Sequence, residues 1–538
     1  MRRPPVIRRI AVLLCLVATS TMAGCFHFFY SPEVKEVVRP AVGDGAPTRL
    51  RASLRAHMAD GGTAIFPDSA WINHDSLWGL GYRTPLLSSI QRPISQVPLD
   101  SVLAVESFRG RLDQGTSVVV SLAATAITPI AFVGMMVAIF GSCPTVYADT
   151  GGGLALEAEG FSYSISPMFE RRDLDRVRVK PGADGIVQLE LRNEAMETHF
   201  INHVELLAVH HDRGVRVAPD HRGAVVALRD VAPITRAVDR AGRDVTARLV
   251  RADGDVYATA PAILESARAG DFEDWIDLDV SNLPPGDSVA VLLRLRNSLL
   301  NTILLYEGML GGRDAPAWLE VDMSRPDQAL ALGRWYGQTM GMRASVVDTQ
   351  RGTAASAVPQ ARLGDVGPIA FRDVALVLPR AHPNDQSVRV RLQFVADNWR
   401  IDAIEVSGRV ERPQVTVLPT AAIDVPTPAA GGAPVRDTAG VRAIRAADAA
   451  YLETRPGQRV LLRFAPDTPP ARVGDETTYL LAWQGWYREW IRGSWLKSPT
   501  RSGPFVPGDS AVLTALARWR TRQASFEQAF YASRVPVR

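Results

Sequence analysis

The densest group of side chains that could bind a metal consists of four histidines between residues 199 and 211. Imidazole nitrogens are common Zn²⁺ ligands, and two histidines four residues apart on a helix present both rings on one face. His199 and His203 have this spacing. However, residues 204–209 are largely apolar and typical of a strand, in which His203 and His211 share a face and His210 points to the other. No His-Glu-x-x-His motif is present. We therefore expect edge or turn histidines, with a metal site at His199 and His203 as the alternative.

A second candidate is a group of aromatic side chains near the C-terminus that could stack on sugar rings. Trp483, Trp486 and Trp490 fall within eight residues, and Trp495 follows shortly after. Large aromatic side chains contribute mainly to protein cores, although they also form binding surfaces. We therefore expect these rings in the core of a C-terminal region. Ligand stacking by Trp483, Trp486 and Trp490 is the alternative.

Cys143 is a third candidate, because a cysteine thiolate is a strong nucleophile. A reactive thiol needs a neighbouring base or a helix N-terminus that lowers its pKa. No histidine lies near Cys143 in the sequence, and the residue follows a long apolar run. The Gly-x-Ser-x-Gly motif of many serine hydrolases is also absent. We therefore expect a structural thiol, no catalytic residues and no cofactor.

The N-terminus predicts export and lipidation. Four arginines in the first nine residues precede an apolar run over residues 10–17, and small and polar residues follow. This order is typical of a secretory signal. The tetrapeptide Met-Ala-Gly-Cys that ends at Cys25 resembles the lipobox of bacterial lipoproteins, which implies cleavage after Gly24 and a lipid on Cys25. We predict a signal peptide over residues 1–24 and a lipidated tether over residues 25–48.

This resemblance implies a membrane-anchored lipoprotein of the bacterial cell envelope, on its periplasmic or cell-surface face. Phe26, rather than an aspartate, follows the lipid site, which by resemblance to enterobacterial sorting favours the outer membrane. Removal of residues 1–24 takes away four arginines and no acidic residue, so the formal net charge changes from +3 to −1. A nearly neutral protein has no overall electrostatic attraction to nucleic acid. With Cys25 lipidated, Cys143 is left as the single thiol and no disulfide can form within the mature chain.

A second segment with membrane character follows the first hundred residues. Residues 114–148 contain no charged side chain, and the central residues 118–140 could span a bilayer as a helix. We predict a transmembrane-like apolar helix over residues 114–142. Arginines precede the segment and acidic residues follow it, so a single crossing from an exported N-terminal part would oppose the positive-inside rule. We therefore expect both flanking parts on the exported side, with a re-entrant hairpin or a buried helix as alternatives to a true crossing.

Strand patterns dominate the rest of the chain and predict a mainly β fold. Short alternating segments between turn residues indicate a small N-terminal β-barrel or sheet over residues 49–112 and a β-rich domain over residues 143–296. Residues 297–412 contain two predicted helices, at 298–310 and 328–339, and a jelly-roll-like β domain. The central region as a whole is expected to be a β-sandwich or jelly roll.

The C-terminal part is predicted to be of mixed α/β structure. A run rich in Pro, Ala, Thr and Gly over residues 413–440 is typical of a linker. Residues 441–538 form the aromatic-rich region, which closes with an amphipathic helix over residues 509–533.

Five short strings carry a wider resemblance: Pro98-Leu99-Asp100-Ser101-Val102, Gly141-Ser142-Cys143-Pro144-Thr145-Val146-Tyr147, Leu191-Arg192-Asn193-Glu194, Arg296-Asn297-Ser298-Leu299-Leu300-Asn301-Thr302 and Trp399-Arg400-Ile401-Asp402. Together they are similar to a broad group of uncharacterised bacterial envelope lipoproteins, over roughly residues 50–410. The resemblance implies a small β domain, an apolar helix, a Ser-Cys-Pro junction and a large β-rich region. That group has no established activity, so the resemblance implies no catalytic residues.

These observations favour a non-catalytic envelope lipoprotein that acts as a scaffold or binding protein through surface contacts. Its expected partners are the membrane, through the lipid anchor and the apolar helix, and envelope proteins or glycans, with no nucleic acid. Two alternatives use the candidate residues above. One is a lipoprotein that binds cell-wall polysaccharide through the C-terminal aromatic rings, and the other is a metal-dependent hydrolase built on the histidines.

Overall fold

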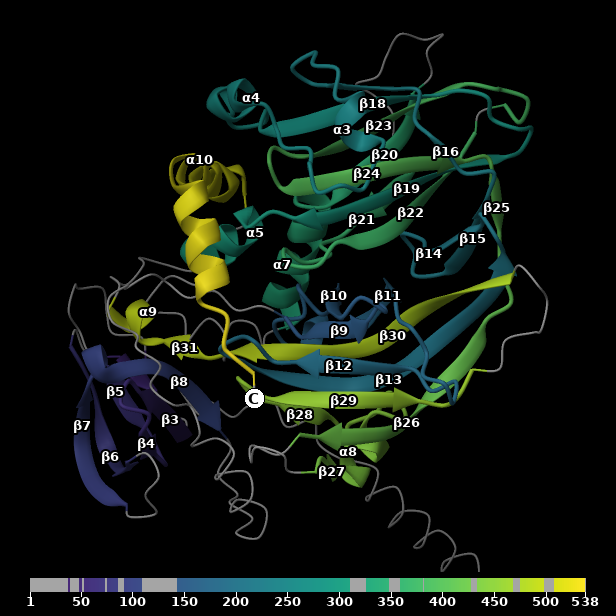
Figure 1. Ribbon diagram of the computed structural model, residues 1–538. Coiled ribbons are helices and arrows are strands. Elements are labelled where there is room, and N and C mark those ends of the chain that lie inside the picture. The colour runs from purple at the N-terminus through teal and green to yellow at the C-terminus, as the bar shows by residue number, and fades with distance from the viewer. Residues whose placement is uncertain are drawn as a thin grey trace, which may run out of the picture.

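The computed structural model describes residues 37–38, 48–50, 53–72, 75–85, 91–108, 143–309, 326–347, 359–380, 382–426, 433–467, 475–497 and 508–537. The signal peptide, Cys25 and the apolar helix predicted over residues 114–142 lie outside these ranges. Within the described ranges, no helix combines the length and the apolar character needed to cross a membrane. The fold is mainly β, as the strand patterns predicted (Figure 1).

The predicted N-terminal β region forms a nine-stranded sheet whose order is β1-β2-β5-β6-β4-β3-β8-β31, with β7 paired to β6. A turn follows β3, and Gly61 adopts a φ of 81° there, a conformation that suits glycine. The last strand of the sheet, β31, comes from the far end of the chain and pairs antiparallel with β8. The strands are β1 (Val37–Val38), β2 (Thr48–Leu50), β3 (Ser53–Met58), β4 (Thr63–Phe66), β5 (Ala70–Ile72), β6 (Ser76–Thr84), β7 (Arg92–Pro98), β8 (Val102–Phe108) and β31 (Ile491–Arg492).

A ten-stranded sheet, called the large sheet below, follows the order β10-β9-β12-β29-β26-β13-β30-β11, with β27 and β28 at its margins. Its two longest strands, β13 and β30, pair antiparallel along their whole length with one bulge between Ile201 and His203. The strands are β9 (Thr145–Asp149), β10 (Leu154–Glu159), β11 (Arg171–Val177), β12 (Gln188–Arg192), β13 (Glu197–Asp212), β26 (Thr416–Val425), β27 (Val435–Arg436), β28 (Leu452–Thr454), β29 (Arg459–Phe464) and β30 (Asp475–Glu489).

The prediction of a linker over residues 413–440 is wrong, because most of the described part of this segment is regular structure. It contains β26, which lies between β13 and β29 inside the large sheet, then β27 and the start of the helix α8 (Thr438–Ala443). Leu418, Ala422 and Ile423 are buried. The small residues and prolines of this segment are typical of a linker, so its composition did not indicate a buried strand.

A pair of smaller sheets, called the two-sheet unit below, stands above the large sheet in Figure 1. One has the order β16-β24-β19-β22 and the other β17-β18-β23-β20-β21. A single cluster of buried apolar side chains draws on strands of both sheets, so their shared core lies between them. The strands are β16 (Ala232–Pro233), β17 (Arg236–Asp239), β18 (Glu273–Val280), β19 (Ser288–Asn297), β20 (Met342–Val347), β21 (Ala361–Leu363), β22 (Arg372–Pro379), β23 (Val388–Val395) and β24 (Trp399–Ser407).

A three-stranded sheet connects the large sheet to the two-sheet unit. It consists of β14 (Arg216–Pro219), β15 (Val225–Arg229) and β25 (Arg409–Glu411). Successive residues of a strand face opposite sides, and here Val217 packs with residues of the large sheet while Ala218 packs with residues of the two-sheet unit. This small sheet therefore has a hydrophobic contact on each face.

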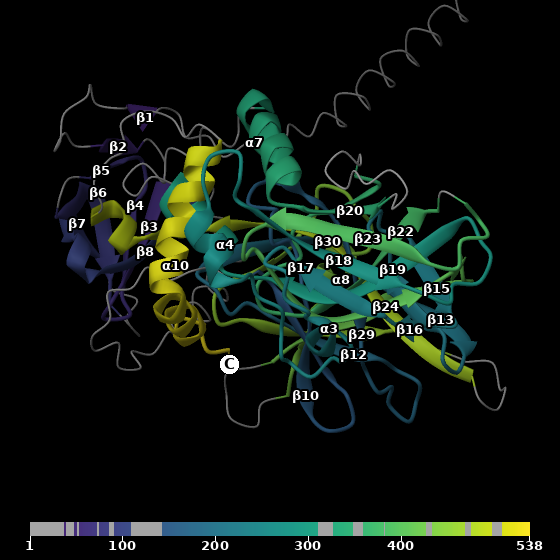
Figure 2. The same ribbon diagram turned by 90° about the horizontal axis from the view of Figure 1, so that it is seen from above.

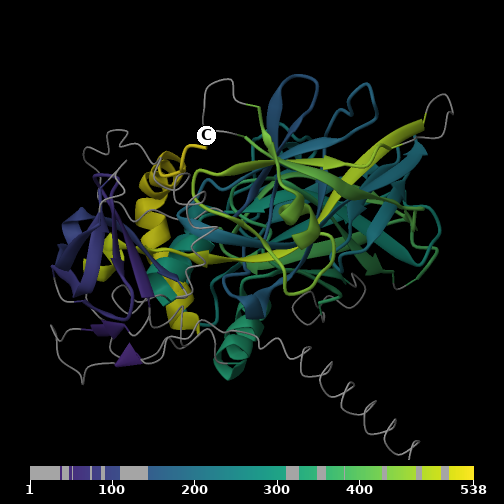
Figure 3. The same cartoon turned by 90° about the horizontal axis from the view of Figure 1, so that it is seen from below.

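The helices predicted over residues 298–310, 328–339 and 509–533 are confirmed. Helix α5 (Leu300–Ile303) continues into the π-helix η3 (Leu304–Met309), and α7 (Pro326–Thr339) follows in the chain. Helix α10 (Asp509–Ala532) buries one face against α5 and η3. Both α5 and α7 lie where the two-sheet unit meets the large sheet, and α10 is on the side of the N-terminal sheet (Figures 1, 2 and 3). The short helices are η1 (Leu99–Ser101), η2 (Pro167–Phe169), α3 (Thr246–Leu249), α4 (Pro261–Ser266) and α9 (Gly493–Lys497).

Candidate functional site

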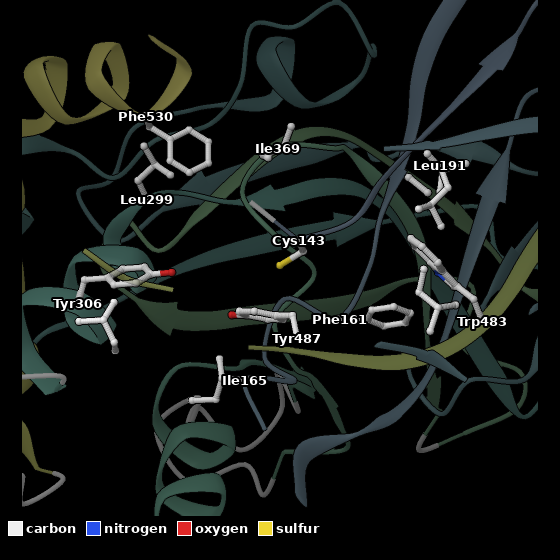
Figure 4. Close-up of a cluster of buried hydrophobic side chains, with 14 of the residues drawn as sticks. Cys143, Phe161, Ile165, Leu191, Leu299, Tyr306, Ile369, Trp483, Tyr487 and Phe530 are labelled. Atoms are coloured by element: carbon white, nitrogen blue, oxygen red, sulfur yellow. The ribbon is translucent and has the colours of Figure 1, made fainter. Parts of the chain in front are cut away.

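A cavity of about 350 Å³ lies where the two-sheet unit meets the large sheet. Its walls come from the end of β10 and the segment after it, from α5 and η3, from α7, and from the turn after β21. Cys143 and Tyr487 contribute from two further points of the chain. Figure 4 shows the Cys143 sulfur and the hydroxyl groups of Tyr306 and Tyr487 facing one common space. Segments up to 344 residues apart in the sequence thus enclose one site.

Glu159 ends β10, and the tight turn that follows it holds this residue in the cavity wall. Gly160 follows directly, and a Cβ at this position would lie 2.3 Å from the ring of Trp483. Phe161 then adopts a φ of 63°, which is uncommon for a residue other than glycine. Its N–H donates to Asp173 Oδ2 at 2.9 Å, and its ring packs on Trp483. Buried partners therefore hold this turn in place.

Glu159 is 1% exposed and is the most unusual group in the wall. Its Oε2 accepts hydrogen bonds from the backbone N–H groups of Ile369 at 2.6 Å and Ala370 at 3.1 Å. Its Oε1 has no hydrogen-bond partner among the described residues. Burial raises the pKa of the Glu159 carboxyl to about 7, and the two N–H groups and Arg372 only partly oppose this effect.

A second carboxyl group lies in the same wall, in the turn after β21. Asp365 is buried and accepts hydrogen bonds from the Tyr336 hydroxyl and from Asn301 Nδ2, the latter at 2.7 Å. Burial raises its pKa to about 6, although these bonds and Arg171 favour the ionised form. The Oδ1 atom of Asn301 is buried and, among the described residues, has no partner. Two acceptor atoms that belong to wall residues are thus left unsatisfied.

The remaining wall is mainly aromatic and aliphatic. The guanidinium of Arg171 lies 3.2 Å from the centre of the Tyr163 ring. Arg171 is also exposed to solvent. The rings are Tyr163, Phe169, Tyr306, Tyr336 and Tyr487, and the aliphatic side chains are Ile165, Met168, Leu305 and Leu332.

A buried polar cluster adjoins the cavity at Tyr306. The Tyr306 hydroxyl donates to Glu489, whose other oxygen accepts from Arg492 at 2.9 Å. Burial holds the pKa values of the Glu489 and Glu197 carboxyls well above their ordinary range, and Arg492 opposes this only in part. Burial also lowers the pKa of His199 to about 3, so its ring is neutral beside Glu197.

The histidines predicted as the alternative metal site are not brought together as ligands. His199 is buried, with Nε2 2.7 Å from Glu197 and Nδ1 3.2 Å from the Thr454 hydroxyl, so both ring nitrogens already have partners. His203 is half-buried and lies 4.0 Å from Glu205. Nowhere in the described part of the chain do three or more His, Cys, Asp or Glu side chains form a group that could hold a metal ion.

The tryptophans proposed as an alternative stacking platform are enclosed by the protein. Trp483 is fully buried and donates from Nε1 to Asp175 at 2.8 Å. Trp486 is stacked on Phe200 with ring centres 4.1 Å apart, and Trp490 is stacked on His57 at 4.2 Å. All three are less than 10% exposed, so they serve as core residues and offer no open face to a sugar.

Cys143 is a buried thiol in the cavity wall. Burial raises its pKa well above the ordinary value, and the nearby Glu159, Glu197 and Glu489 carboxyls raise it further. A thiol in such surroundings is a poor nucleophile, which agrees with the structural role expected from the sequence.

Sequence reasoning missed the carboxyl and amide groups of the site. Glu159 and Asp365 belong to no recognised motif, although each stands next to or near glycines at the end of a strand. A partial signal did exist, because two of the five quoted strings contribute to the wall: residues 141–147 supply Cys143, and residues 296–302 supply Asn297, Ser298 and Asn301.

The chain matches no protein-family model and none of the curated proteins.

Proposed function

We propose that this chain is a membrane-anchored lipoprotein of the bacterial envelope that binds a small molecule in the cavity between the large sheet and the two-sheet unit, without acting on it as an enzyme. The cavity carries the proposal. Small-molecule sites typically occupy about 300–1,000 Å³, are mostly apolar and contain a few convergent polar groups with perturbed pKa values. A volume of about 350 Å³, aromatic and aliphatic walls, and two buried carboxyls match this pattern.

The envelope part of the proposal rests on the sequence. The signal-like N-terminus and the Met-Ala-Gly-Cys string support a lipid on Cys25. Residues 114–142 would provide a second contact with the membrane, and envelope proteins or glycans remain candidate partners for the outer surface. The finer description of the central region as a jelly roll and of the N-terminal region as a barrel also stays a proposal.

A variant with a bulky side chain at an exposed position of the cavity wall tests the binding function. Gly337 on α7 belongs to the wall, and a Cβ added there meets no other atom within 4 Å. Gly337→Trp therefore adds an indole at the cavity without a backbone clash. Gly337→Ala is the matched control, because it leaves the cavity open and should stabilise the helix by about 0.5 kcal/mol.

The measurement is mass spectrometry of small molecules released on denaturing the purified full-length chain. We expect a molecule that accompanies the wild type and Gly337→Ala, and that is at least about tenfold depleted in Gly337→Trp. Release of the same molecules from all three proteins would contradict binding in this cavity.

A further inference from the structure

We propose that the cavity binds an organic ammonium ion with an apolar body: the Glu159 carboxylate and the Asn301 amide oxygen accept hydrogen bonds from the ammonium group, Asp365 adds negative charge beside it, and the surrounding rings enclose the rest. This inference rests on the proposed small-molecule binding and specifies its ligand.

The charges of the wall favour a cation. Among the described residues, three acidic side chains line the cavity, Glu159, Glu170 and Asp365, against the single basic residue Arg171. Arg372, which lies behind Glu159, is already paired with Asp173 and with Asp175 at 2.5 Å. An anionic ligand would therefore meet mainly like charge, which is strongly unfavourable at a desolvated site.

The unsatisfied atoms favour a ligand that donates hydrogen bonds. Glu159 Oε1 and Asn301 Oδ1 are both acceptors, and neither has a partner among the described residues. A buried acceptor without a partner is destabilising, and a donor supplied by a ligand would relieve that cost. The oxygens of Glu170, in contrast, are already used by Asn202, Gln484 and Tyr451.

The aromatic side chains favour the same kind of ligand. A cation is attracted to the face of an aromatic ring, most strongly where water is excluded. The hydroxyls of Tyr306 and Tyr336 already donate to Glu489 and Asp365, so these two residues have mainly their rings to offer. Tyr163 shows the interaction within the protein itself, because its ring lies against the Arg171 guanidinium.

Binding of a cation should be coupled to pH. With pKa values of about 7 and about 6, Glu159 and Asp365 are partly protonated near neutral pH, and an ammonium ion binds best when both are ionised. Affinity should therefore rise as the pH increases from 5 to 8, with release of protons on binding. The titratable and charged groups that act on these two carboxyls are Arg372, Arg534, Cys143, Glu197 and Tyr487 around Glu159, and Arg171 and Tyr336 around Asp365.

Three probes of similar size and different charge test the inference by calorimetry on the full-length chain. They are phenethylammonium, the neutral 2-phenylethanol and the anionic 3-phenylpropanoate. At pH 8 we expect the ammonium ion to bind at least about tenfold more tightly than the alcohol, and the carboxylate to bind more weakly than either. The amine keeps its charge across this range, so a loss of at least about tenfold in its affinity at pH 5 would report the protein carboxyls.

Glu159→Gln keeps the shape of the side chain and removes its charge. We expect it to weaken phenethylammonium binding at least about tenfold, to leave binding of 2-phenylethanol unchanged and to reduce the pH dependence. Asp365→Asn is the second variant in case Glu159→Gln does not fold. Glu476→Gln is the control, because this carboxyl is exposed on β30 away from the cavity wall.

The possible outcomes separate this inference from the proposed function. Equal or tighter binding of the alcohol or the carboxylate would overturn the ammonium ion as the ligand and leave small-molecule binding in place. Absence of binding by phenethylammonium would also overturn it, while a neutral or anionic molecule depleted in Gly337→Trp would still support the proposed function.

Discussion

Glu106 on β8 joins two residues of the N-terminal sheet to Arg455, which follows β28 of the large sheet. It is buried, and its carboxylate lies 3.3 Å from His57, 3.4 Å from Arg55 and 3.7 Å from Arg455. Burial alone would raise its pKa, but these three partners outweigh burial and lower the pKa to about 2. We expect Glu106→Gln to destabilise the folded chain by about 2–4 kcal/mol at pH 7, because a buried carboxylate loses its ion pairs with two half-buried arginines and its contact with the buried His57.

The pH dependence of this effect has a definite sign. A carboxyl whose pKa is lowered by folding stabilises the protein above its unfolded pKa, and this contribution is lost as the pH falls toward about 2. In urea unfolding, the difference between wild type and Glu106→Gln should therefore be smaller at pH 3 than at pH 7. Glu453→Gln, at an exposed position, should show no such difference. An equal loss at both pH values would mean that the charge of Glu106 does not matter.

The thiol of Cys143 should be inert in the folded protein. Burial and three neighbouring carboxyls raise its pKa, so almost no thiolate is present at pH 8. We expect it to react with a maleimide at least about 100-fold more slowly than a cysteine placed on the exposed surface of α10 by Ser510→Cys. Rapid labelling of native Cys143, followed by mass spectrometry, would argue for an open and reactive site.

For single residues, the sequence predicted the environment of the tryptophans but did not indicate the carboxyl groups that line the cavity. The tryptophans were expected in the core, and they are there. Glu159 and Asp365 could not be recognised, because their properties come from burial by segments far away in the chain. Ile369 and Ala370, for example, bond to Glu159 across more than 200 residues.

At the scale of elements, the turn after β10 positions the cavity wall, and Gly160 is its critical residue. A Cβ there would overlap Trp483, a ring that is itself fixed by Asp175. We expect Gly160→Ala to destabilise the protein by about 1–3 kcal/mol in urea unfolding, because the core must move to accept the methyl group. Gly152→Ala is the matched control, since its Cβ would meet nothing within 4 Å. Equal stability of the two variants would show that the turn adapts freely.

The helices and most strands were predictable because their apolar residues repeat with a clear period. The buried residues of α10, from Val512 to Phe530, begin with the i, i+3, i+4, i+7 spacing that marks one face of a helix. Strand β26 was missed for the opposite reason, since its small residues and prolines resemble a linker. Its place inside the large sheet depends on pairing with β13 and β29, which is non-local and leaves little trace in the segment itself.

At the scale of the whole molecule, the pairing of β8 with β31 decides which topologies are possible. Strand β8 precedes the apolar segment and Cys143 follows it. Yet β31, which extends from β30 of the large sheet, pairs with β8 in the N-terminal sheet, and Trp490 stacks on His57 at the same junction. Residues of both regions also share one hydrophobic core. A single membrane crossing by residues 114–142 would separate parts that are packed together here.

We therefore predict that the N-terminal sheet lies on the same side of the membrane as the large sheet and the two-sheet unit. Single cysteines introduced by Asp68→Cys in the N-terminal sheet and by Ser266→Cys in α4, each in a Cys143→Ser background, are both at exposed positions. In intact spheroplasts, a membrane-impermeant maleimide should label both if the chain is exported as proposed. Labelling of Asp68→Cys alone, with Ser266→Cys reacting only after lysis, would require the β8–β31 pairing to be absent in the cell. Because that pairing needs both segments in one compartment, the two labels test the fold and the topology together.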